Sequence, residues 1–112
     1  MDSQHFEQGA FFIGCNYWAS HAGMFMWRDW DERTVEEDLR RLAQARITTL
    51  RVFPLWSDFQ PLRLHMGAHG EPREERLAET PLAFDEAGCA GVDTVMLERF
   101  RKFCDLAEKY RL

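Results

Sequence analysis

The sequence predicts an α/β fold in which two short strands alternate with two amphipathic helices. Three observations carry this prediction: a nearly continuous apolar run over residues 11–18, a β-branched and aromatic run over 48–53, and a stretch of helical apolar spacing after each run. Strands that alternate with helices in this way pair in parallel. The 112 residues are enough for one small domain. We expect an N-terminal tail over 1–10 and a single domain over 11–112.

The first strand and the first helix follow directly from the residue pattern. The run from Phe11 to Trp18 is typical of a strand that is buried on both faces. The helix begins near Thr34, which with Glu37 fits a capping box, although Asp31 is an alternative N-cap one turn earlier. Its apolar stripe consists of Val35, Leu39, Leu42 and Ala43.

The second strand, Thr48 to Phe53, is followed by Pro54, which cannot donate to a sheet ladder. The next stretch, 57–91, is rich in proline, glycine and charge, and we expect a long loop there, of a length that is usually functional or mobile. A second helix then follows, with Asp93 as its candidate N-cap. Its apolar residues repeat with helical spacing at Met96, Phe100, Phe103, Cys104, Ala107 and Tyr110.

Charge and hydropathy exclude several classes of function. Fourteen Lys and Arg residues against nineteen Asp and Glu give a net charge of −5, which argues against a nucleic-acid partner. No apolar run approaches the roughly 18 residues of a membrane span, so no membrane partner is expected. The first eight residues lack the features of a signal peptide, and a cytoplasmic location is the default expectation. The three cysteines form no CxxC pair and are expected to be reduced thiols.

Four segments in order along the chain resemble the opening of glycoside hydrolase family 5, the group of cellulases and mannanases. The segments are Gly14–Trp18, Trp27–Asp31, Glu37–Leu42 and Thr49–Pro61, and the last helix, from Val92 to Tyr110, is similar to the second barrel helix of the same enzymes. The resemblance implies a TIM (β/α)₈ barrel, of which residues 11–112 would form the first two βα units. It also implies hydrolysis of a β-linked polysaccharide or oligosaccharide of the mannan or cellulose class, with retention.

The resemblance assigns substrate-binding positions to four residues. Arg51 would lie at the carboxyl end of the second barrel strand and donate to the catalytic nucleophile, holding that carboxylate ionised. Asn16 would hydrogen-bond near the cleft, and Trp18 or Trp56 would stack on a sugar ring. The carboxyl ends of the strands carry the active site in such barrels. The alternatives are an Arg51 that pairs with a structural acid and tryptophans that serve packing.

We expect no catalytic residue in this chain. A retaining glycosidase needs two carboxylates about 5–5.5 Å apart, and the family has them as glutamates after later strands. Asp58 is near the right face but is more typical of a cap or turn. His65 and His69 have i, i+4 spacing but lie in a segment with glycines and without a third ligand, so no metal or other cofactor is expected. The isolated chain should therefore be inactive.

Two further hypotheses remain open. Two parallel strands with apolar faces have open edges, so the chain could be a non-catalytic module that associates with itself or with the remainder of a barrel. It could also be a weak carbohydrate-binding module that retains part of an aromatic cleft. Arg46 and Arg111 occupy positions after the helices where the family usually has glycine, so each would adopt a positive φ at some cost or the helix end would differ.

Overall fold

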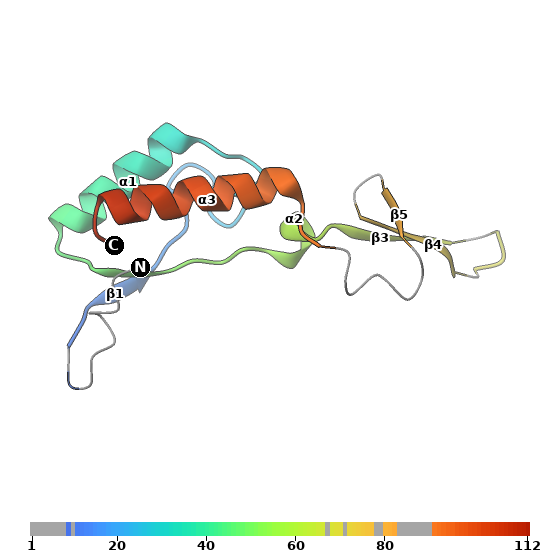
Figure 1. Cartoon of the computed structure of the whole chain (residues 1–112), viewed down its shortest axis with the longest axis horizontal. Coiled ribbons are helices and arrows are strands. Elements are labelled where there is room, and N and C mark those ends of the chain that lie inside the picture. The colour runs from blue at the N-terminus through green and yellow to red at the C-terminus, as the bar shows by residue number, and fades with distance from the viewer. Residues whose placement is uncertain (1–8, 10, 67, 71, 78–79, 83–90) are drawn as a thin grey trace. The chain divides into compact units, whose positions relative to one another are not determined.

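The computed structural model describes residue 9 and residues 11–66, 68–70, 72–77, 80–82 and 91–112. Its elements are β1 (Gly14–Asn16), α1 (Glu32–Gln44), β2 (Thr49–Arg51), α2 (Trp56–Phe59), β3 (Leu62–Met66), β4 (Pro72–Leu77), β5 (Thr80–Leu82) and α3 (Thr94–Lys109) (Figure 1). The chain divides into two compact units, one of residues 1–53 with 99–112 and the other of residues 54–98. Each unit is described by itself.

The first unit contains a parallel strand pair. The register sets Gly14 opposite Thr49, Cys15 opposite Leu50 and Asn16 opposite Arg51. Backbone bonds extend the ladder at both ends, since Thr48 N donates to Ile13 O and Tyr17 N donates to Arg51 O. A Cβ atom at Gly14 would lie 2.8 Å from the Thr49 carbonyl oxygen. The absence of a side chain at Gly14 therefore allows the two strands to approach this closely.

The first strand is shorter and more exposed than its sequence predicts. β1 covers three residues, and the apolar residues before it are exposed, with Phe11 at 90% and Ile13 at 54%. The prediction of burial on both faces was wrong for the described chain. Its helices cover one face of the pair, while Asn16 and Arg51 are exposed on the other. The full eightfold barrel stays a prediction.

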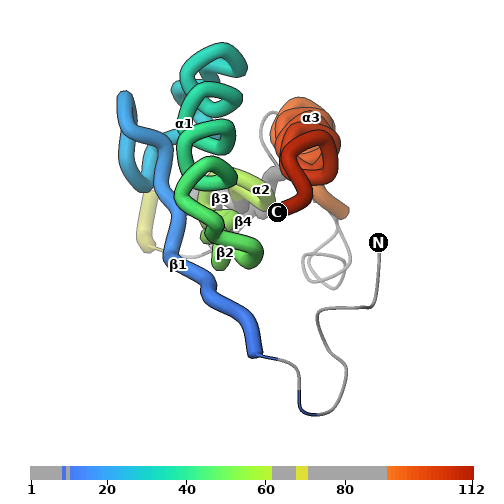
Figure 2. Tube along the Cα trace, turned by 90° about the vertical axis from the view of Figure 1, so that its left-hand side faces the viewer, coloured from blue at the N-terminus to red at the C-terminus, as the bar shows by residue number. Residues whose placement is uncertain are grey.

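Helices α1 and α3 lie side by side in the first unit (Figure 2) and run in the same direction (Figure 1). In the N-terminal half of α1, the Glu36 carboxylate accepts hydrogen bonds from two residues at the C-terminal end of α3, the Lys109 ammonium and, at 2.9 Å, the Tyr110 hydroxyl. One turn nearer the N-terminus of α1, Glu32 pairs with Lys102 at 3.3 Å. These contacts join the two helices along their exposed edges.

Large apolar side chains form the core between these helices and the loop before α1. Its buried members are Tyr17, Ala19, Met26, Trp27, Val35, Leu39, Phe103 and Leu106. Trp27 is fully buried, and its ring lies 6.0 Å from that of Trp30 and 5.7 Å from those of Phe100 and Phe103. Trp27 is therefore a central core residue.

Both long helices begin at an aspartate N-cap. Asp31 accepts from the Thr34 backbone N at 3.1 Å and from the Thr34 hydroxyl at 3.0 Å, so α1 begins one turn before the Thr34 cap that we preferred. Asp93 accepts from the backbone N–H groups of Val95 and Met96 at 3.0 Å each. The predicted cap of the last helix is thus confirmed.

Both long helices also end in the same way. Arg46 and Arg111 have φ values of 64° and 58°, in the left-handed region that favours glycine. At the end of α1, the residue after Arg46 donates its N–H to Leu42 O, and Arg46 N donates to Ala43 O. The corresponding bonds occur around Arg111. This is the Schellman arrangement, so of the two alternatives for these positions the structure has the arginines at a positive φ.

The second unit contains secondary structure where the sequence predicted a long loop. The short helix α2 is followed by an antiparallel sheet in the order β3–β4–β5, with Leu62 opposite Leu77 and Glu75 opposite Leu82. Asp93 N donates to Phe59 O, which ties the start of the last helix to the end of α2. The prediction of a continuous loop over 57–91 was wrong for the described part of that span.

Candidate functional site

The two faces of the β1–β2 pair differ in what covers them. Directly after β1, the Tyr17 hydroxyl donates to the Asp38 carboxylate of α1 at 3.0 Å, and the Tyr17 ring stacks on Phe103 of α3. Tyr17 thus identifies the helix-covered face. Because side chains alternate along an extended chain, Asn16 and Trp18 lie on the opposite face. We call that face, with Asn16, Trp18, Arg51 and Phe53, the open face.

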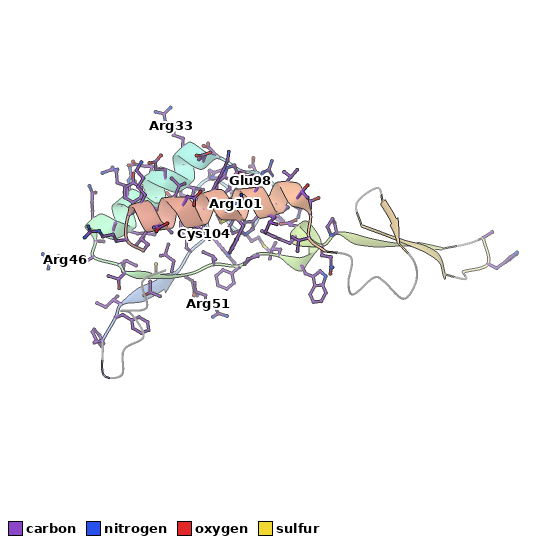
Figure 3. All side chains as sticks on the ribbon, viewed as in Figure 1. Arg33, Arg46, Arg51, Glu98, Arg101 and Cys104 are labelled. Atoms are coloured by element: carbon purple, nitrogen blue, oxygen red, sulfur yellow. The ribbon has the colours of Figure 1, made fainter. Side chains whose placement is uncertain are left out.

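Asn16 and Arg51 are brought together at the carboxyl ends of the two strands. They are directly paired in the parallel register, and both are exposed. The Arg51 side chain extends away from α1 and α3 (Figure 3). An open concavity of about 390 Å³ is lined by Gly14, Cys15, Asn16, Thr49, Leu50 and Arg51. Two polar side chains of adjacent strands therefore share one surface.

An aromatic cluster lies beside this polar pair. The rings of Trp18 and Phe53 meet edge to face, with centroids 5.8 Å apart and planes at 69°. The Arg51 guanidinium carbon lies 5.0 Å from the centroid of the Phe53 ring. Trp18 remains 53% exposed, so its indole is accessible to a ligand. The open face thus combines an aromatic platform, a cation and an amide.

The backbone that presents these residues is held from the helix side. Asp38 accepts from Ser20 N at 2.8 Å as well as from the Tyr17 hydroxyl, so one carboxylate binds the chain on both sides of Trp18. Burial, together with the charge of Asp38, raises the pKa of Tyr17 well above its usual range. The Tyr17 phenol is therefore neutral and serves as a hydrogen-bond donor.

Trp56 belongs to the second unit and is described by itself. Its indole is 75% exposed at the beginning of α2. In the same helix Asp58 is buried in the first turn. His69 is exposed, and the side chain of His65 lies outside the described residues. No group of three metal-ligating side chains occurs in the described part of the chain.

Phe53 is the site residue that the sequence reasoning missed. We included it in the second strand and gave it no role in binding. A signal was present, because Phe53 is two residues after Arg51 in an extended segment and so lies on the same face. Its contact with Trp18 joins residues 35 positions apart and depends on the strand register. Spacing within either strand does not reveal such a contact.

Comparison with known proteins gives no further identification. No protein-family model, no curated protein and no solved structure matches this sequence. Among the described residues, no helix has both the length and the apolar character that a membrane crossing requires. The residues of the open face and the resemblance of the sequence motifs are therefore the evidence on function.

Proposed function

We propose that this chain is the N-terminal part of a retaining β-glycosidase similar to glycoside hydrolase family 5, and that it supplies one side of the sugar-binding cleft. The observation that carries the proposal is the direct pairing of Asn16 with Arg51 at the carboxyl ends of two adjacent parallel strands. In barrels built from βα units, that end of the strands carries the active site. The substrate class proposed is a β-linked polysaccharide or oligosaccharide of the mannan or cellulose type.

In this proposal Arg51 acts on a carboxylate supplied by a later part of the parent enzyme. Its guanidinium is exposed on the open face, and none of the carboxylates in the described ranges forms an ion pair with it. A guanidinium beside the nucleophilic carboxylate would keep that group ionised and fix its orientation. Asn16, its partner in the register, would donate to a sugar hydroxyl or to the same carboxylate.

The aromatic residues would bind the sugar itself. Trp18, which contacts Phe53, exposes half of its surface on the open face, and an indole face packs well on the apolar C–H face of a pyranose ring. Trp56, in the second unit, is proposed as a further sugar-stacking residue on account of its 75% exposure. The two catalytic carboxylates are not among these proposed roles, so the 112-residue chain should not hydrolyse its substrate by itself.

The decisive experiment is to read the coding DNA on both sides of the segment that encodes residues 1–112. The proposal expects the reading frame to continue into further βα units, with a glutamate at the carboxyl end of two later strands. A frame that ends after codon 112 contradicts it. As a biochemical control, the purified chain should release no reducing ends from β-mannan or carboxymethyl cellulose. Hydrolysis by the pure chain contradicts the proposal that the catalytic carboxylates come from a later part of the parent enzyme.

A second candidate function is self-association, and the exposed apolar run before β1 favours it. Phe11 and Ile13 are 90% and 54% exposed, and β1 and β2 pair only with each other among the strands that the structure describes. Unpaired strand edges beside apolar residues are association sites. Light scattering at increasing protein concentration tests this: association requires a rising mass, whereas a constant monomer mass contradicts it.

A further inference from the structure

On the open face, the Phe53 ring contacts both Arg51 and Trp18. Its ring face lies 5.0 Å from the guanidinium carbon, and its centroid is 5.8 Å from that of the indole. Its carbonyl oxygen accepts a hydrogen bond from Trp27 Nε1 at 3.0 Å. Trp27 is fully buried in the core. Phe53 is thus anchored from the helix side and contacts two exposed side chains on the other side.

An exposed arginine or tryptophan samples several rotamers unless a neighbour restricts it. A guanidinium over an aromatic face is attracted by the ring quadrupole, and an edge-to-face aromatic pair restricts the second ring. Both interactions here use one ring. Their combined effect is to hold a cation and an indole in a defined mutual geometry before any ligand arrives, which lowers the entropic cost of binding.

We infer that Phe53 is a positioning residue: its ring holds the Arg51 guanidinium and the Trp18 indole together on the open face, as one preorganised sugar subsite. The positioning itself is a property of this chain, while its use in sugar binding rests on the proposed function. Phe53 acts through its two neighbours, and the proposal assigns it no direct contact with the sugar.

The experiment compares the complete 112-residue chain with Phe53→Leu and Phe53→Tyr by NMR. Ring current from Phe53 should shift the Arg51 Nε–H proton upfield in the parent protein. Phe53→Leu should remove this shift and broaden or move the Trp18 indole signal, while Phe53→Tyr should retain both. The matched control is Phe25→Leu, because Arg28 lies 5.1 Å from the Phe25 ring in a second, separate cation–π pair. It should leave the Arg51 and Trp18 signals unchanged.

The second readout is titration with β-1,4-mannotetraose, followed by the Trp18 indole signal. Phe53→Leu should weaken binding by about twofold to fivefold, the range expected for the loss of one exposed cation–π contact, and Phe53→Tyr should restore it. If the parent protein shows no binding while the Arg51 shift still depends on Phe53, sugar binding by the proposed cleft is contradicted and the positioning role stands.

An Arg51 signal that is the same in the parent protein and in a folded Phe53→Leu variant overturns the proposal. Far-ultraviolet circular dichroism and thermal unfolding establish that the variant is folded. If Phe53→Leu does not fold, nuclear Overhauser contacts in the parent protein decide. Contacts from the Phe53 ring protons to both the Arg51 side chain and the Trp18 indole support the positioning role, and the absence of either set overturns it.

Discussion

The two faces of the β1–β2 pair present neighbouring residues that differ in role: one packs against the helices and the next is exposed. Tyr17 on the helix-covered face is 4% exposed, hydrogen-bonded to Asp38 and stacked on Phe103. Trp18, the next residue, is 53% exposed on the open face and contacts Phe53. Stability of the first unit therefore depends on one face, and the groups that can meet a ligand lie on the other. Substitutions on the two faces should differ accordingly in their effect on the free energy of unfolding.

The largest effect is expected in the core behind the helix-covered face. Trp27→Ala removes a fully buried indole that contacts three aromatic rings and donates to Phe53 O. Such a truncation costs about 3–5 kcal/mol, which is a large part of the stability of a small domain. Urea denaturation measures it. A loss below about 1 kcal/mol, which is typical of surface substitutions, would break the distinction between the faces.

Gly14→Ala should give the second largest effect, and it sharpens the comparison because Gly14 belongs to the strand pair itself. The new Cβ would lie 2.8 Å from the Thr49 carbonyl oxygen and 3.1 Å from the Thr49 Cβ. Neither backbone can move without disturbing the parallel ladder, so a cost of about 1–3 kcal/mol is expected.

The matched control is Gly23→Ala, where a Cβ atom would meet no heavy atom within 4 Å beyond its chain neighbours but φ is +57°. That substitution introduces backbone strain without a steric clash. Its effect on the Tyr17 amide and on the β1–β2 hydrogen bonds should be small, which hydrogen exchange can measure. If Gly23→Ala opens the ladder as much as Gly14→Ala does, the close approach at Gly14 is not what governs the strand pairing.

Much of the first unit could be predicted from the sequence because its signals are local. The aspartate cap of the last helix and the apolar stripe that includes Val35 and Leu39 each depend on residues within a few positions. The choice between Asp31 and Thr34 as the first cap required the structure, because both side chains suit the position and both precede an apolar stripe. The parallel pairing of the two strands was expected from their alternation with helices.

The antiparallel sheet of the second unit could not be predicted in the same way. The segment Leu62–Met66 does alternate apolar and polar residues, which is a strand signal that the sequence analysis overlooked. Its partner, Pro72–Leu77, has no such alternation and contains four consecutive charged residues. Pairing with β3 and β5 supplies the hydrogen bonds that make this segment a strand. Such pairing is a tertiary effect that overrides local preference.

Tyr17→Phe tests the hydrogen bond of the helix-covered face, with an expected cost of about 1 kcal/mol. It also removes a pH dependence. The folded state raises the pKa of Tyr17 through burial and the charge of Asp38, whereas the unfolded chain titrates near the ordinary value of about 10. The contribution of Tyr17 to the free energy of unfolding is therefore fully present below a pH of about 10. It is lost as the pH rises above that value, because only the unfolded chain releases the proton.

The control for this prediction is Tyr110→Phe, which removes a hydroxyl that donates to Glu36 at 2.9 Å. The free energy of unfolding, measured by denaturation at a series of alkaline pH values, should fall more steeply with pH for the parent protein than for Tyr17→Phe. Tyr110→Phe should keep the dependence that Tyr17 causes. Equal slopes for the parent protein and Tyr17→Phe would show that the phenol is not held neutral by the fold.

Arg51→Gln on the open face should have the smallest effect on stability. The guanidinium is exposed, and the contact it loses is a single cation–π interaction with Phe53, worth less than about 1 kcal/mol at an exposed site. The same substitution should abolish the response of the Trp18 indole to β-1,4-mannotetraose if Arg51 belongs to a sugar subsite. A stability loss as large as that of Tyr17→Phe, with sugar binding unchanged, would instead make Arg51 a structural residue. The open face would then differ from the helix-covered face only in exposure. Arg51 would no longer support a sugar cleft at the carboxyl ends of β1 and β2.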